Sequence, residues 1–367
     1  MKIYCKKSDL NNAINTVSHA VPTRTTSSVL EGILIETFNE NMMLTATDTN
    51  ITIMTNIRAE SENNISFVVI AGLFSSIVSK LPEEEVVIDY DENHSKITIK
   101  SGRFSSELIC FSSEEFPKIH VEEGNKIFLS KKTVKKLIKK TVFSASADEI
   151  NGILTGVLIE LENHNLRMVA VDTFRLAIYN AKVDTDEEVK IVVPARLLGE
   201  VAKIINDDNE EEQLIIEIID NKLVFSFDNH KIIVNTLNGK YIDYNRIIKD
   251  DSLIKIRVLK NDLMKSIDRA SIIASAQNNN LIKFNIYEDT IDISSLSDQG
   301  NIEEKVEVMK DGPNLEIGFN SHYMMDILKV IEDEEIYLNM KDSVSPCIIK
   351  PLSGDSYLYL VLPVRIS

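Results

Sequence analysis

Hydrophobic residues recur at helical spacing in three segments of the chain, Lys6–Val21, Ser130–Ala145 and Leu259–Ala274. Each segment places apolar or small residues at positions i, i+3, i+4 and i+7, a pattern that predicts an amphipathic helix with one buried face. The positions expected to be buried are Leu10, Ala13, Ile14, Val17, Val134, Leu137, Ile138, Thr141, Leu263, Ser266, Ile267 and Ala270.

A second element also occurs three times, in which a short apolar strand runs directly into a helix. It begins at Phe67, Lys190 and Leu315, about 125 residues apart each time. A period of this length indicates a triplicated domain, since solenoid repeats are far shorter. The predicted domains are 1–122, 123–249 and 250–367, joined by the polar segments Val121–Lys126 and Ile248–Leu253.

Runs of alternating or continuous apolar residues between these helices predict several strands in each domain, separated by turn residues such as Asp220 and Asn221. Two helices and many antiparallel strands per domain indicate an α+β fold, with sheets and helices in separate layers. The expected strands are Ile33–Thr37, Met43–Thr47, Ile51–Ile57, Val86–Tyr90, Lys96–Lys100, Thr155–Leu161, Arg167–Asp172, Leu214–Ile219, Lys222–Asp228, Ile232–Leu237, Leu281–Tyr287, Thr290–Leu296, Lys305–Val308, Ile336–Met340 and Cys347–Pro351.

The composition is that of an ordinary globular protein, with 44% hydrophobic and 26% charged residues. No apolar run reaches the length of a membrane span, and the N-terminus lacks the apolar core of a signal peptide, so a cytoplasmic location is expected. Cys5, Cys110 and Cys347 fall one in each domain without metal-ligand spacing. They are expected to be buried free thiols, and neither a metal nor a cofactor is predicted.

The net charge is −17, which by itself argues against a nucleic-acid partner. The charge is unevenly distributed, however, because the six predicted helices together carry +10. The most basic is Lys131–Lys140, with six lysines and no acid, and its lysines are expected to occupy the face opposite Val134, Leu137 and Ile138. Such a face is either a solubilising surface or a binding surface for phosphates.

The chain lacks the glycine-rich and nucleophile motifs that mark phosphate-binding or hydrolytic sites. Asp48, Asp172 and Asp298 occupy matching positions in the three domains and are expected to cap turns between strands. The acidic runs Glu83–Glu85 and Glu210–Glu212 are expected to be solvated turns. No catalytic residue is predicted.

Nine short motifs, taken in order along the whole chain, resemble those of the bacterial sliding clamp family, the beta subunit of DNA polymerase III. They are SGRF from Ser101, EEFP from Glu114, LTGVLIE from Leu154, VAVDTFRLA from Val169, IVVPAR from Ile191, DYNRII from Asp243, EIGFNSHY from Glu316, DSVSP from Asp342 and LVLPVR from Leu360.

The resemblance implies a head-to-tail dimer that closes into a ring of six domains, with helices lining the hole and sheets forming the outer wall. Basic lining helices would hold duplex DNA through its phosphates without reading its sequence. The residues expected to contact DNA are Arg24, Lys80, Lys131, Lys132, Lys135, Lys136, Lys139, Lys140, Arg196, Lys203, Lys265 and Arg269.

The resemblance also implies an apolar pocket that captures a short peptide from the replicative polymerase, the clamp loader and other replication or repair proteins. Phe174 stands where many members of the family have His or Tyr, and Ile242 where Pro is usual, and both departures are expected to change the peptide preference. Asn151 stands where Arg is usual, which removes a positive charge near the DNA and the rim of the pocket. The matching pocket residues are Leu154, Thr173, Phe174, Arg175, Leu176, Ile242, Arg246, Ile247, Pro346, Leu360, Leu362 and Pro363.

For the ring joint, the resemblance implies contact between an edge strand of the first domain and a helix and strand of the third domain of a second copy. Basic and apolar residues on one side would face acidic and apolar residues on the other. The matching positions are Lys96, Arg103, Phe104, Leu108, Ile272, Ile273, Asp298, Glu303 and Glu304.

Two other hypotheses are compatible with the sequence. One is a protein-interaction scaffold of the same fold that does not encircle DNA. The other is a hydrolase or transferase on a tripled scaffold, which would need a cleft with clustered, unrepeated polar residues that the sequence lacks.

Overall fold

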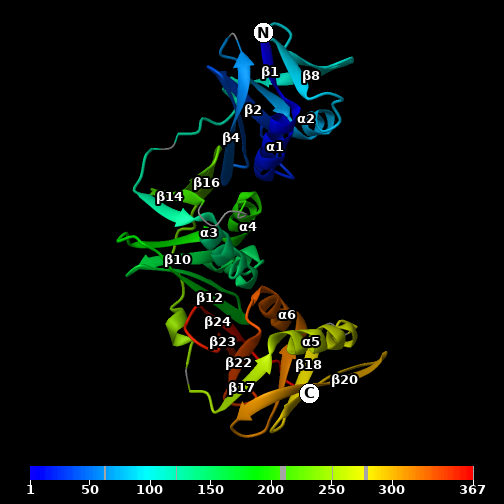
Figure 1. The fold of residues 1–367 in the computed structure, drawn as a ribbon, viewed down its shortest axis with the longest axis vertical. Coiled ribbons are helices and arrows are strands. Elements are labelled where there is room, and N and C mark those ends of the chain that lie inside the picture. Colours follow the sequence, from blue (N-terminus) through cyan, green and yellow to red (C-terminus); the bar gives the residue numbers. More distant parts are fainter. Residues whose placement is uncertain (62, 121, 207–211, 250, 277–279, 367) are drawn as a thin grey trace. The chain divides into compact units, whose positions relative to one another are not determined.

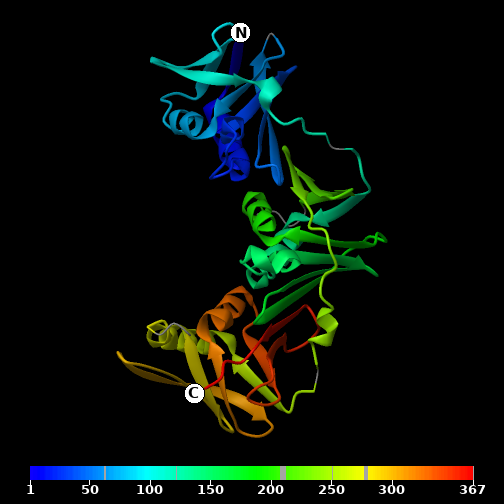
Figure 2. The ribbon, with the colours of Figure 1, turned by 180° about the vertical axis from the view of Figure 1, so that it is seen from behind.

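The structure is a computed structural model that describes residues 1–61, 63–120, 122–206, 212–249, 251–276 and 280–366. Within these residues the chain forms two 12-stranded antiparallel sheets and six α-helices (Figures 1 and 2). The helices are α1 (Lys7–Val17), α2 (Ala71–Val78), α3 (Lys131–Lys139), α4 (Ala195–Ile204), α5 (Lys260–Ala274) and α6 (Ser321–Val330).

The first sheet combines strands from the first and second predicted domains, through pairing of β4 with β16. Its strands, in spatial order, are β1 (Lys2–Lys6), β6 (Glu85–Asp91), β7 (Lys96–Ser101), β8 (Phe104–Ser112), β5 (Ser66–Ile70), β2 (Gly32–Phe38), β3 (Asn41–Thr47), β4 (Ile51–Ser61), β16 (His230–Asn235), β15 (Lys222–Phe227), β14 (Gln213–Ile219) and β9 (Lys126–Ser130).

The second sheet combines strands from the second and third predicted domains, through pairing of β12 with β24. Its strands, in spatial order, are β13 (Val189–Pro194), β10 (Gly156–Glu162), β11 (Asn165–Val171), β12 (Arg175–Lys182), β24 (Tyr357–Val361), β23 (Cys347–Pro351), β22 (Glu335–Met340), β17 (Ile254–Leu259), β20 (Gly300–Asp311), β19 (Thr290–Ser297), β18 (Leu281–Ile286) and β21 (Leu315–Asn320).

The chain divides into two compact units that follow these two sheets. The first unit contains Met1–Lys132 and Lys203–Thr236, and the second contains Thr133–Ala202 and Leu237–Ser367. The strands of the second predicted domain are therefore divided between the units. The two predicted linkers each include a residue outside the described ranges, 121 and 250, and both linkers stay predictions.

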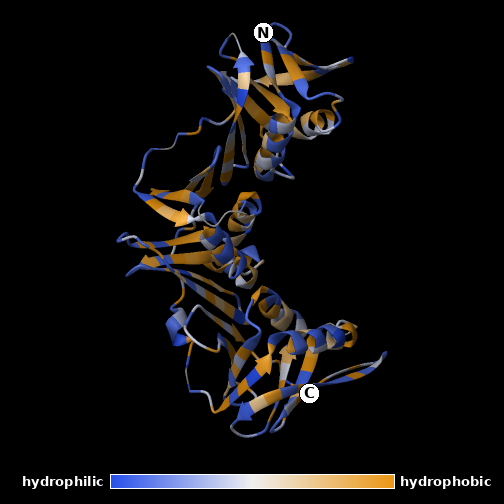
Figure 3. Ribbon diagram, in the orientation of Figure 1, coloured by the Kyte–Doolittle hydropathy of each residue, from blue (hydrophilic) through white to orange (hydrophobic). Residues whose placement is uncertain are grey.

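The predicted helix faces are confirmed, because all twelve positions expected from the i, i+3, i+4, i+7 pattern are buried. In the first unit α1 packs beside α2, and in the second unit α5 packs beside α6 (Figure 1). Hydrophobic and hydrophilic bands alternate along many strands in Figure 3, which is the pattern of sheets with one covered face. The prediction of an α+β fold with strands running into helices is confirmed.

Two of the three predicted aspartate turns are confirmed. The Asp48 carboxylate accepts hydrogen bonds from the backbone of Asn50 and Ile51, and Asp172 does the same for Phe174 and Arg175. In the third turn, the prediction that Asp298 caps the turn is wrong. There the Ser297 hydroxyl, rather than Asp298, accepts the backbone N–H of Gln299 at 3.2 Å.

The expectation of solvated acidic turns is incomplete. The Glu84 carboxylate accepts the backbone N–H of Ser8 at 3.0 Å, so it caps the start of α1. Hydrogen bonds from Ser8 lower the pKa of Glu84. Glu212 forms an ion pair that is described below, whereas Glu210 and Glu211 lie outside the described residues.

The three cysteines are buried free thiols, as predicted. Burial raises the pKa of Cys5, Cys110 and Cys347 to about 12, which makes these thiols poor nucleophiles. Within the described part of the chain, no helix combines the length and apolar character needed to cross a membrane.

Candidate functional sites

The lysine-rich helix α3 carries two kinds of lysine. Lys131 is only 1% exposed, and its ammonium group donates to Glu212 at 2.6 Å and Asp228 at 2.5 Å. Lys140, just after the helix, is also buried and bonds the Val330 carbonyl. The prediction that all six lysines lie on the exposed face is therefore wrong for Lys131 and Lys140, which are held by carboxylates and a carbonyl of the protein itself.

A third carboxylate, that of Glu332, binds a lysine of this helix and the lysine that follows it, within the second unit. Glu332, just after α6, accepts Lys136 at 2.7 Å and Lys140 at 2.8 Å. Burial alone would raise the pKa of Glu332, but hydrogen bonds from the two lysines outweigh burial and lower that pKa to about 2. These ion pairs connect helix α3 of the second predicted domain with the residues that follow helix α6 in the third.

Replacing Glu332 with glutamine should lower the free energy of unfolding by about 1 kcal/mol at pH 7, since much of the pair's strength is screened by solvent. Because the folded pKa is depressed, the wild-type advantage is full above the unfolded pKa of about 4.3 and disappears as the pH falls towards about 2. Denaturant unfolding at pH 7, 4.5 and 3 measures this difference. Glu334→Gln, at an exposed neighbour, is the control, and a pH-independent difference would contradict the ion-pair account.

The other residues predicted to contact DNA are mostly exposed. Arg269 is exposed but is not free of partners, because its guanidinium group donates two hydrogen bonds of 2.6 Å to Glu304. Lys135 is half-buried, as is Lys136. The exposed members are Arg24, Lys80, Lys132, Lys139, Arg196, Lys203, Lys265 and Arg269.

Five of the predicted pocket residues meet in one hydrophobic cluster of the second unit. Leu176 of β12 and Leu360 of β24 are buried at its centre, where they are register partners in adjacent strands. Leu154, Ile242 and Leu362 are partly buried against it. Residues from distant parts of the chain thus converge on one hydrophobic cluster, the arrangement that the predicted pocket needs.

Phe174, in the turn before β12, and Arg175, the first residue of β12, have different environments. The Phe174 ring is 50% exposed and stacks on Tyr323 of α6, with ring centroids 5.7 Å apart. The Arg175 side chain is 11% exposed, with Nε 3.0 Å from Asp172 and Nη1 2.5 Å from Asp326. Arg175 Nε and Nη1 are therefore already bound to carboxylates of the same chain.

The remaining predicted pocket residues are accessible to different degrees. The Arg246 side chain is well exposed although its Nε lies 2.8 Å from Asp243, so it is the more available of the two arginines. Thr173 and Ile247 are exposed, whereas Pro346 and Pro363 are partly buried. Leu362 is fixed beside the turn, because its backbone N–H donates to the Phe174 carbonyl at 2.8 Å.

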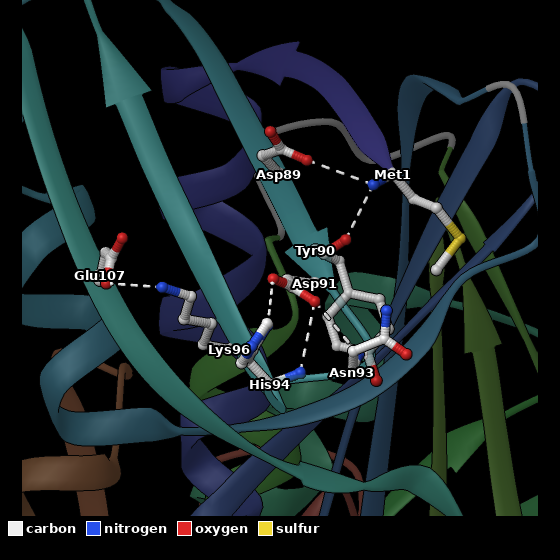
Figure 4. Close-up of polar contacts among 8 residues, drawn as sticks. All are labelled: Met1, Asp89, Tyr90, Asp91, Asn93, His94, Lys96 and Glu107. Atoms are coloured by element: carbon white, nitrogen blue, oxygen red, sulfur yellow. Dashed lines mark hydrogen bonds and ion pairs between the residues drawn. The ribbon is translucent and has the colours of Figure 1, made fainter.

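The predicted joint residues of the first unit lie on the β7–β8 hairpin. Residues 104–109 of β8 pair only with β7, so one backbone edge of this segment is without a partner strand among the described residues. Figure 4 shows that Lys96 of β7 donates to Glu107 of β8, at 3.0 Å. Phe104 and Arg103 are exposed and Leu108 is half-buried, while the neighbouring Ile109, not predicted, is 78% exposed.

The predicted joint residues of the second unit lie on α5 and the β19–β20 hairpin. The first part of β20, residues 300–307, pairs only with β19 and also has an edge without a partner strand in the described residues. Ile272 is 68% exposed and Ile273 is half-buried. Asp298 and Glu303 are exposed, whereas Glu304 is held by Arg269.

Family models and known proteins match the chain over its length. The models for the DNA polymerase III beta subunit match residues 1–120 (N-terminal domain), 128–243 (central domain) and 245–365 (C-terminal domain). The beta sliding clamps of Staphylococcus epidermidis and Staphylococcus aureus are each 32% identical, over 100% of this chain and 99% of the relative. The chain belongs to the DNA polymerase III beta subunit family.

Solved structures of this family share the fold. The DNA polymerase sliding clamp of Bacillus subtilis matches with a TM-score of 0.96 and 32% identity, covering all of both chains. A putative DNA polymerase III beta subunit of Eubacterium rectale matches with a TM-score of 0.95 and 34% identity, also over all of both chains. The predicted resemblance and the triplicated clamp fold are confirmed, and the family is one of non-catalytic processivity factors.

Sequence reasoning missed Tyr323 and Asp326 beside the pocket turn, and Ile109 at the β8 edge. Tyr323 belongs to the motif EIGFNSHY, which contributed to the resemblance, but the sequence does not reveal that its ring stacks on Phe174. Asp326 is a single acid on an amphipathic helix, and no spacing rule connects it with Arg175 151 residues away.

Proposed function

We propose that this protein is a DNA sliding clamp that works as a homodimeric ring in the cytoplasm. Two copies would close head to tail around duplex DNA and move along it without sequence preference. A peptide pocket on each copy would tether the replicative DNA polymerase, the clamp loader and other partners. The domain boundaries 1–122, 123–249 and 250–367 belong to this proposal, and the family-model matches lie close to them.

The observation that carries the proposal is the concentration of exposed positive charge on helices of an acidic chain. Lys132 and Lys139 of α3, Arg196 and Lys203 of α4, and Lys265 of α5 are exposed, although the protein as a whole carries a charge of −17. Basic helices that contact phosphates give sequence-independent attraction. An acidic remainder of the surface discourages nonspecific DNA binding elsewhere.

The joint proposed for the ring uses the two open strand edges. The edge of β8 at residues 104–109 and the edge of β20 at 300–307 each present unpaired backbone groups, which can add a strand from another chain. Both strands extend beyond the body of their own unit in Figure 1. A contact between different surfaces of two identical chains closes a ring when the rotation permits.

The test of the proposal is topological retention. Loaded on nicked circular DNA by a clamp loader with ATP, the protein should stay bound through gel filtration and fall off when the circle is cut. Linear DNA with both ends blocked by bound protein is the control, and retention should return on it. Equal retention on open linear and circular DNA would contradict the ring and favour the non-encircling scaffold.

A further inference from the structure

The β11–β12 turn beside the pocket is fixed partly by its own aspartate. One Asp172 oxygen accepts the backbone N–H groups of Phe174 at 2.7 Å and Arg175 at 2.9 Å. The other oxygen accepts Arg175 Nε at 3.0 Å. These bonds set the backbone of the turn and one side of the guanidinium group. They leave the outer end of the Arg175 side chain to be held by something else.

That outer end is held by helix α6. Arg175 Nη1 donates to Asp326 Oδ2 at 2.5 Å, and the guanidinium carbon lies 4.6 Å from the centre of the Tyr323 ring. The Phe143 ring lies on the same guanidinium group at 5.6 Å. A planar guanidinium group both bonds carboxylates in a fixed geometry and stacks on aromatic faces. Asp326 therefore fixes the group that lies against Tyr323.

Tyr323 in turn supports the exposed residue of the pocket turn. Its ring stacks on Phe174 with an angle of 20° between the planes, and the Phe174 carbonyl accepts the backbone N–H of Leu362. Phe174 has no polar group of its own to fix its ring. The orientation of the Phe174 ring therefore depends on its stacking against Tyr323. The Tyr323 ring is in turn positioned by the guanidinium group of Arg175.

We infer that Asp326 is a positioning residue for the partner pocket, acting through Arg175 on the Phe174–Tyr323 pair. The inference rests on the proposed peptide-binding function. Asp326 reaches the pocket turn from the third domain, whereas Arg175 and Phe174 belong to the second. A bound peptide side chain would meet a ring pair already held in place, so less conformational freedom is lost on binding.

Asp326→Asn tests this role, because asparagine keeps the size of the side chain and removes its charge. The probe is a fluorescein-labelled peptide carrying the clamp-binding motif of the replicative polymerase, and its Kd is measured by fluorescence anisotropy with a scrambled peptide as control. The variant should bind about tenfold more weakly, a change of about 1.4 kcal/mol. Asp289→Asn, an exposed aspartate in the β18–β19 turn, is the matched control and should bind like the wild type.

A double-mutant cycle separates positioning from a general structural effect. In an Arg175→Gln background, which already lacks the guanidinium group, Asp326→Asn should cause little further loss of affinity. Sedimentation and thermal unfolding, measured on the same variants, show whether the fold and the dimer survive. If Asp326→Asn does not fold, Asp326→Glu serves instead, because it keeps the charge but shifts the carboxylate, and it should weaken binding by several fold.

Unchanged affinity in a folded Asp326 variant would overturn the inference, as would an equal loss in the wild-type and Arg175→Gln backgrounds. Failure of the wild-type protein to bind any such peptide is a different result, because it would contradict the proposed pocket itself. The two failures are therefore distinguished by the wild-type measurement alone.

Discussion

Under the proposed head-to-tail ring, replacing both Ile272 and Ile273 with alanine is expected to convert the proposed dimer into a folded monomer. On α5 these residues follow Arg269 by three and four positions, so they lie one turn beyond the contact of Arg269 with Glu304 of β20. Ile272 is largely exposed in the single chain, which leaves its apolar area available to a second copy. Loss of both side chains at a buried joint should cost on the order of 2–4 kcal/mol of association free energy.

Sedimentation at low micromolar concentration measures this change, and circular dichroism checks that the fold is retained. Ile150→Ala is the matched control, because Ile150 is equally apolar and strongly exposed but lies on the segment Glu149–Thr155, away from the proposed joint. The control should remain dimeric. A double variant that also remains dimeric would show that the joint lies elsewhere on the chain.

The helices and their buried faces could be predicted because they depend on local periodicity. Every position of the i, i+3, i+4, i+7 pattern is buried, including the polar residues Thr141 and Ser266. The strands were predicted less completely, and β8, which pairs with its sequence neighbour β7, is absent from the expected strands. β12 and β24 were missed, although each pairs with the other, because the burial of Leu176 and Leu360 depends on a contact across the second and third domains.

The pocket and the joint came from the resemblance, and the structure adds what the resemblance could not supply. It brings Leu154, Leu176, Ile242, Leu360 and Leu362 into one cluster, which no single segment reveals. The charged residues show the limit most clearly. A lysine has the same appearance in a sequence whether it meets solvent or a carboxylate, so the roles of Lys131 and Arg175 could be assigned only once their partners were located.

Among single replacements of the lysines of α3, Lys131→Met should lower the free energy of unfolding most. Lys131 is nevertheless the first residue of the basic run Lys131–Lys140. Methionine keeps the apolar stem but leaves Glu212 and Asp228 facing each other without a cation. Breaking a fully buried pair costs about 3–5 kcal/mol. Because both carboxylates are roughly half-exposed, we expect a loss of about 2 kcal/mol in the free energy of unfolding, seen as a lower denaturation midpoint.

The same ion pairs predict a dependence on alkaline pH. Burial disfavours the ammonium form, but the hydrogen bonds to Asp228 and Glu212 outweigh it and raise the pKa of Lys131. A raised pKa means that the contribution to stability is complete below the unfolded lysine value of about 10.4 and is lost as the pH rises above it. The difference between the wild type and Lys131→Met should therefore be constant from pH 7 to 9 and shrink above pH 10.

Lys139→Met is the matched control, since Lys139 ends the same helix and is exposed. Under the proposed function the two variants should separate stability from DNA attraction. Lys139→Met should leave the unfolding free energy nearly unchanged and shorten the residence of the clamp on DNA with open ends. Lys131→Met should lower the unfolding free energy and leave the residence of the clamp on DNA nearly unchanged. If Lys131→Met unfolds like the wild type yet weakens DNA attraction, then Lys131 is accessible in solution and the basic face is larger than the structure indicates.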